Sequence, residues 1–168
     1  MMAKSLNPKA GHSAEWWKQR IAYLDRKQCK NGKELQETIS QLVEAHAGYT
    51  RAAIVAAVVR EFGLLVQRTP VDTGRARAGW QIGTAPTEWV PSKAQWDEYK
   101  TDAQVKATLA KVLPPNTQLS QADVVYISNN VEYILALEAG WSAQAPRGFI
   151  GLFIQSLQQQ LNALAAKL

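Results

Sequence analysis

The feature that most constrains this chain is an abrupt change of pattern between residues 69 and 80. Over residues 33–68, apolar residues recur every three or four positions, which predicts one long helix with an apolar stripe. Pro70 lacks an amide hydrogen and disfavours helical angles at Thr69, so the helix should end just before this pair. Gly74 can adopt the positive φ of a tight turn. The sequence therefore predicts a long helix, a turn and a new element.

Beyond the turn, side chains alternate between two faces from Arg75 to Thr84, which predicts a β-strand. A second strand is expected from Ala122 to Ser128, with apolar groups on both faces. A shorter helix should begin at Thr101 or Asp102. The apolar face of the first strand would carry Ala76, Ala78, Trp80 and Ile82, and its other face Arg75, Arg77, Gly79 and Gln81.

The last 20 residues repeat apolar side chains at alternating three and four spacing, which predicts an amphipathic closing helix. These elements together predict an α+β fold. A small, mainly antiparallel sheet with one further short strand would pack against the long central helix and the closing helix. An N-terminal helical arm would precede them.

The domain organisation expected from these patterns is a tail and short helical arm over residues 1–32, then a single α+β domain over residues 33–168. Ser13 can cap the arm helix, which carries Trp16 and Trp17. These tryptophans should dock either on the long helix of the same chain or on a neighbouring subunit. The domain contains a tryptophan-rich loop, residues 85–101, expected to pack on the sheet or against a partner.

Composition excludes several kinds of site. The chain has 168 residues, a formal charge of +5 and a single cysteine, Cys29, so it cannot form an internal disulfide or a cysteine-based zinc site. Its two histidines lie in the tail (His12) and on the apolar stripe (His46), which gives little support for a metal site or a histidine-based triad. No apolar run is long enough to span a membrane, and no apolar signal segment opens the chain. We therefore expect no metal, no cofactor and no membrane contact.

The turn resembles a family motif. Residues 69–79 read T-P-V-D-T-G-R-A-R-A-G. They are similar to the T-P-V-D-T-G-R-L-R-x-S that follows a helix in the neck and tail-completion proteins of long-tailed bacteriophages, the family named after gene product ten of a lambdoid coliphage. In this chain Ala76 replaces a larger aliphatic residue, and Gly79 replaces a small hydroxyl residue.

A second stretch, between Val131 and Ile150, also resembles this family. Its members carry a tyrosine, a short apolar stretch, a Glu-x-Gly, a loop with a proline and a closing helix. Glu138 is an acid among apolar residues and needs a partner, either Arg75 or Arg77, unless it lies exposed at a helix end. The matching residues are Tyr133, Ile134 to Leu137, Glu138, Gly140, Pro146 and Phe149.

The resemblance implies a structural protein of the virion, made in the host cytoplasm and located at the head-tail junction. It would form a homo-oligomeric ring, hexameric by preference and dodecameric as the alternative. Its partners would be the head-closure or connector proteins on one side and the tail terminator and tail tube proteins on the other. Genomic DNA would pass through the lumen without sequence-specific binding, and no catalytic residue is implied.

The residues expected to matter fall into two groups. The motif turn and strand comprise Pro70, Asp72, Thr73, Gly74, Arg75, Arg77 and Trp80. We expect the two arginines to form ion pairs at an interface rather than to contact DNA, because a strongly basic channel would retain phosphates. The interface candidates are Trp16, Trp17, Trp89, Trp96, Glu138, Gly140 and Trp141.

Two other classes of function compete with this interpretation. Asp72-Thr73-Gly74 is also the catalytic triplet of aspartic proteases, where two such loops share one proton. The adjacent Arg75 would hold Asp72 ionised and oppose that sharing. A DNA-binding regulator is the other alternative, suggested by basic residues near the N-terminus that otherwise form a solvated face; they are Lys18, Arg20, Arg26, Lys27, Lys30 and Lys33.

Overall fold

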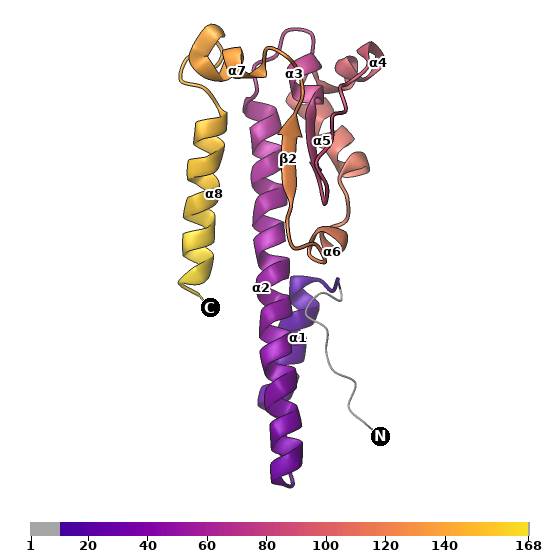
Figure 1. The fold of residues 1–168 in the computed structure, drawn as a ribbon, viewed down its shortest axis with the longest axis vertical. Coiled ribbons are helices and arrows are strands. Elements are labelled where there is room, and N and C mark those ends of the chain that lie inside the picture. The colour runs from indigo at the N-terminus through magenta and orange to yellow at the C-terminus, as the bar shows by residue number, and fades with distance from the viewer. Residues whose placement is uncertain (1–10, 168) are drawn as a thin grey trace. The chain divides into compact units, whose positions relative to one another are not determined.

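The fold is α+β, as the sequence predicts (Figure 1). The computed structural model describes residues 11–167, so the tail expected over residues 1–10 lies outside the described residues. The described chain forms two compact units: residues 11–56 with 115–123, and residues 57–114 with 124–167. This division does not follow the expected boundary at residue 32, because the long helix α2 (Gly32–Arg68) contributes residues to both units.

The first unit combines helix α1 (Ala14–Asp25), the first part of α2 and the short helix α6 (Asn116–Leu119). Ser13 caps α1 as expected, because its hydroxyl accepts a hydrogen bond from the Trp16 amide at 3.2 Å. Trp17 is fully buried and packs on α2 at Gly48, where a Cβ would overlap its ring. Gly48 therefore provides room for Trp17 in a helix that continues through it.

Most of the apolar stripe expected along the first part of α2 is not the face that packs, although Leu42 does pack against the Trp17 cluster. Leu35, Ile39 and Val43 are between 50% and 65% exposed, and His46 is exposed as well. The large Trp17 ring and polar partners explain this difference: Arg20 donates to Gln41 Oε1 at 3.1 Å and Lys27 to Thr38 Oγ1 at 3.2 Å. The buried face instead consists of small and polar residues, namely Thr38, Gln41, Ala45, Gly48, Ala52 and Val55.

The second unit contains the sheet and most of the remaining helices. Strand β1 (Trp80–Gly83) pairs antiparallel with β2 (Tyr126–Asn129), so that Trp80 faces Asn129 and Gly83 faces Tyr126. The other elements are α3 (Arg75–Ala78), α4 (Lys93–Trp96), a 3₁₀ turn (Asp97–Tyr99), α5 (Asp102–Val112), α7 (Ile134–Ala136), a π-helical turn (Leu137–Trp141) and α8 (Ile150–Ala165).

The core of this unit forms where the end of α2 meets β1 and the start of α8. Phe62, Leu65 and Val66 are at most 1% exposed, and they pack with Trp80 and Phe149. Burying each large apolar side chain contributes roughly 1.5–3 kcal/mol. The closing helix places its apolar side here as predicted, with Phe153 buried and Leu157 packed against the core.

The expected strand from Arg75 to Thr84 is wrong over its first half. Residues 75–78 form one helical turn, with amide-to-carbonyl hydrogen bonds from Ala78 to Gly74 at 2.9 Å and from Gly79 to Arg75 at 3.0 Å. Alanine favours helix over strand, and an alternating apolar pattern of four residues cannot outweigh that preference.

The second strand is also shorter than expected, because only its last residues pair with β1. Within residues 11–167 the sheet has two strands, so the further strand expected from the sequence does not form in the described part. No helix in that part combines the length and apolar character needed to cross a membrane.

Candidate functional site

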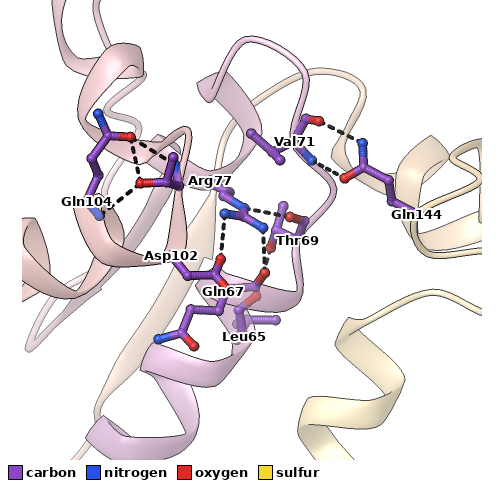
Figure 2. Close-up of polar contacts among 9 residues, drawn as sticks. Leu65, Gln67, Thr69, Val71, Arg77, Asp102, Gln104 and Gln144 are labelled. Atoms are coloured by element: carbon purple, nitrogen blue, oxygen red, sulfur yellow. Dashed lines mark hydrogen bonds and ion pairs between the residues drawn. The ribbon is translucent and has the colours of Figure 1, made fainter.

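The turn after α2 is built around Arg77, whose side chain is buried although it is charged. Its guanidinium donates to the backbone oxygens of Thr69 and Gln67, at 2.8 and 2.7 Å, and to Asp102 Oδ1 at 3.0 Å (Figure 2). The last carbonyls of a helix have no amide donors within it. Arg77 supplies those donors, so it caps the long helix and joins it to the first residue of α5.

A second contact holds the same helix end from the side of β1. The Trp80 indole Nε1 donates to Thr69 Oγ1 at 2.8 Å, and that hydroxyl donates to the Leu65 carbonyl at 2.9 Å. Trp80 and Thr69 are both buried, where an unpaired polar group would cost about 1–3 kcal/mol. The hydrogen bonds therefore fix the orientation of a large core side chain as well as the helix end.

Gly74 makes the sharp turn between these groups possible. Its φ is 89°, in the left-handed region that strongly favours glycine. A Cβ at this position would overlap the backbone oxygen of Trp96. The turn thus needs glycine both for its backbone angle and for the close approach of the segment around α4.

Arg75 lies on the outer side of the turn and pairs with Glu132 through two hydrogen bonds, of 2.7 and 2.8 Å. Its guanidinium lies 5.6 Å from the ring centres of both Trp96 and Tyr133. A hydrogen bond from its own backbone amide, followed by the Arg75 contact, holds the pKa of Glu132 below its usual value. Arg75 is therefore engaged within the subunit.

Gln144 connects the two stretches that resemble the phage family. Its side-chain oxygen accepts from the Val71 amide at 2.9 Å, and its side-chain nitrogen donates to the Val71 carbonyl at 2.7 Å (Figure 2). This pair of hydrogen bonds imitates the pairing of two extended backbones. The loop between α7 and α8 is thereby fastened to the turn after α2.

Glu138 does not pair with either arginine, so that expectation is wrong. Its carboxylate accepts hydrogen bonds from the amides of Phe149 and Ile150, both at 2.7 Å, and of Gly151 at 3.0 Å. Burial alone would raise the pKa of Glu138, but the three amide donors outweigh it and hold the pKa below its usual value. The first amides of a helix lack partners within it, and they favour negative charge. Glu138 therefore caps α8.

The Glu-x-Gly of the second stretch forms a closed loop. Gly140 has a φ of 88°, and a Cβ there would lie 2.6 Å from the Pro146 carbonyl oxygen. The residue after this tight contact, Trp141, is 83% exposed. The loop thus holds a large apolar side chain in water on a backbone that is fixed at both ends.

The other tryptophans predicted to lie at interfaces differ in their surroundings. Trp16 stacks on His12 with ring centres 3.7 Å apart, and Trp17 is buried in the first unit. Trp96 is half-buried and donates to the Pro91 carbonyl at 3.2 Å, whereas Trp89 is exposed. Docking within the chain accounts for Trp17, and an interface role for the rest stays a prediction.

Asp72 and Thr73 are exposed at the tip of the turn, beside a cavity lined in part by Tyr133, Leu137 and Gln144. Among the described residues that line this cavity, Asp72 is the only carboxylate. The shared proton of an aspartic protease needs a second one. Across residues 11–167, no group of three histidine, cysteine or acidic side chains is placed to hold a metal ion.

Sequence reasoning found the turn but missed several of its partners. The sequence indicated Asp102 only as a possible first residue of a helix, not as a partner of Arg77. The capping box of Thr101 and Gln104 confirms that α5 begins there. Glu132 and Gln144 carry no local signal, because each contacts a residue more than 50 positions away. Such pairs can be read only from the folded chain.

We compared the chain with known proteins, and no family model, curated protein or solved structure matches it.

Proposed function

We propose that this protein is a structural subunit of a bacteriophage virion, located at the head-tail junction. Copies of it would form a ring, hexameric by preference and dodecameric as the alternative, between the head connector and the tail. The observation that carries the proposal is the link between the two family-like stretches, since Gln144 in the second binds Val71 in the first. The two motifs resemble one family in sequence, and here they form one unit in space.

The state of the two motif arginines supports a passive channel. Arg77 is buried on helix carbonyls and Asp102, and Arg75 is held by Glu132. Phosphate contacts by lysine and arginine supply most non-specific DNA affinity. Arginines that are already paired add little to such affinity, so genomic DNA can pass the ring without being retained by this motif.

The proposal assigns no catalytic residue. Asp72-Thr73-Gly74 serves as a turn, with Gly74 providing the left-handed backbone that lets the chain reverse. An aspartic protease would instead need two copies of the triplet facing each other. This sequence contains the triplet once, so a second chain would have to supply the other copy. The protein would then act only by binding to connector, tail terminator and tail tube proteins through its surface, without catalysing a reaction.

The test is to delete the gene from the phage that carries it and to image the particles by electron microscopy. We expect DNA-filled heads and separate tails that do not join, because the ring between them is missing. Complementation with wild-type protein and with Asp72→Asn should both restore joined particles.

Two results would contradict the proposal. One is a normal yield of joined particles without the chain. The other is that the Asp72→Asn variant folds but does not restore joined particles in the deletion strain, which would favour the aspartic-protease alternative. Salt-dependent retention of the purified protein on duplex DNA, together with normal particles, would favour a DNA-binding regulator.

A further inference from the structure

Trp141 is presented in a way that suits an anchor. It is 83% exposed, yet the turn that carries it is held by the Gly140 contact with Pro146 and by the Glu138 cap on α8. Ordering a side chain at an interface costs less when its backbone is already fixed. Tryptophan is among the residues that most often dominate binding energy when they enter an apolar pocket.

The same unit contains a groove that an aromatic ring can enter. The groove runs between β1 and α5, and its cavity has a volume of about 160 Å³. A cavity of about 150 Å³ is large enough to hold a benzene ring. Its walls combine apolar and polar side chains, with Trp80, Tyr99 and Leu109 inside and the exposed Trp89 and Val112 at the rim.

The anchor and the groove belong to different elements of the second unit. Figure 1 draws α7 to the left of β2 and α5 to its right. Trp80, which lines the groove, contacts Phe149 edge-on at 6.4 Å between ring centres, and Phe149 in turn donates its amide to Glu138 in the Trp141 turn. Trp141 is 83% exposed and is not among the residues that line the groove, so it does not fill the groove of its own chain.

The charge near the anchor is opposite to the charge in the groove. Arg147 is the only cation between residues 138 and 148, and Glu98 is the only charged side chain that lines the groove. Both are exposed. Among the described residues neither has an ion-pair partner, and the Glu98 carboxylate accepts one long hydrogen bond, from Thr108 Oγ1 at 3.5 Å. A second copy of the chain would therefore meet the groove with opposite charge.

We propose that Trp141 of one copy occupies the groove between β1 and α5 of the next copy, with Arg147 facing Glu98. The contact is heterologous, because each copy uses one surface as anchor and another as socket. Repetition of such a contact closes a ring when the rotation between copies permits it. The closure into a ring rests on the proposed function, whereas the contact between two copies does not.

Cross-linking of the purified full chain tests the contact. In a Cys29→Ser background, one variant carries Ala143→Cys beside the anchor and another carries Val112→Cys at the groove rim. With a short bis-maleimide, we expect neither variant alone to cross-link, their mixture to give a dimer, and the double variant to give a ladder of higher oligomers. Cross-linking of the Ala143→Cys variant with itself, or no product in the mixture, would overturn the proposal.

Further substitutions show whether the named side chains make the contact. Trp141→Ala should reduce the cross-linked product at least tenfold, whereas Tyr23→Ala, which removes another exposed aromatic from α1, should leave it unchanged. Arg147→Glu in one variant should reduce the product, and Glu98→Arg in the other should restore it. Equal product from the Trp141→Ala and Tyr23→Ala variants, or no restoration by the charge exchange, would overturn the assignment.

The cross-linking experiment and the gene deletion test different claims. Cross-links with normal joined particles would contradict only the proposed function. Separate heads and tails without cross-links would contradict only this contact.

Discussion

The two ends of α2 carry similar apolar patterns but have opposite surroundings. In the last turns, Phe62, Leu65 and Val66 are buried in the core of the second unit. Near the start, Leu35 and Val43 are at least half exposed. The periodicity is the same in both places, so it specifies the helix but not which face is covered.

What differs is the kind of contact around each end. The C-terminal end is held by Arg77 on two carbonyls and by Trp80 on Thr69. The N-terminal part packs through mostly small and polar residues against Trp17 and Leu24, and side chains of α1 and the following turn bond its polar groups. The comparison teaches that the turn after α2 combines a helix cap with core packing, whereas the start of α2 packs on α1 through smaller groups.

The largest expected effect contrasts the two ends directly. Phe62→Ala should lower the free energy of unfolding by about 3–5 kcal/mol, because it leaves a cavity in the core. Val43→Ala, a smaller truncation on the exposed face, should alter it by less than about 0.5 kcal/mol. Urea unfolding of both variants measures the difference. Equal losses would show that the two ends of the helix are packed alike, against this account.

The next effect isolates the cap. Arg77→Met keeps much of the apolar stem but removes the donors to the buried Thr69 carbonyl and the half-buried Gln67 carbonyl, so we expect a loss of about 3 kcal/mol in the free energy of unfolding. Arg77→Lys should show part of this loss of stability, because an ammonium group cannot make all three hydrogen bonds of the planar guanidinium. The control is Arg68→Met, which removes an exposed cation from the same helix end and should cost little. Similar unfolding curves for the two Met variants would refute the capping role.

A somewhat smaller effect is expected at the turn itself. Gly74→Ala forces a left-handed angle on a side chain that would overlap the Trp96 backbone, and it should cost about 2 kcal/mol or more. Gly83→Ala is the control, because a Cβ there would lie 3.8 Å from its nearest neighbour, in ordinary contact. Thermal unfolding compares them. A Gly74→Ala protein as stable as the control would mean that the turn can relax without loss.

The smallest expected effect concerns the cap of α8 and its pH dependence. The pKa of Glu138 is lowered in the folded protein, so its charge stabilises the fold above the pKa of the unfolded chain. That contribution is lost as the pH falls through the lowered folded value. Glu138→Gln should cost about 1 kcal/mol at pH 7. The difference in the free energy of unfolding between wild type and Glu138→Gln should become smaller in urea titrations from pH 7 towards pH 3. A difference that stays constant over this range would exclude the charged cap.

Much of the fold could be predicted because it rests on local chemistry. The Ser13 cap, the end of α2 before Pro70, the start of α5 and the apolar side of α8 all follow from short-range preferences. The strand predicted from Arg75 failed because alternation over a few alanines is a weak signal beside a glycine turn that starts a helix. Long-range packing decided which face of α2 is buried, and no local pattern contains that information.

The site was predictable in position but not in its pairing. The motif placed Arg75, Arg77 and Glu138 among the residues that matter, and sequence reasoning then paired them with each other. In the folded chain the two arginines take Glu132 and Asp102, while Glu138 takes backbone amides. Helix ends present unpaired carbonyls and amides that compete with side chains for charged partners, and sequence reasoning gave them too little weight.

Hydrogen-deuterium exchange of the whole protein tests the central claim most directly, since it reports the local stability of each backbone segment. We expect the amides of residues 62–68 to be among the slowest to exchange, and those of residues 35–43 to exchange markedly faster. In Arg77→Met the first segment should lose most of its protection, while the second should change little. Equal protection of both segments in the wild type, or equal loss in the variant, would contradict the claim that the turn after α2 holds the C-terminal end of this helix.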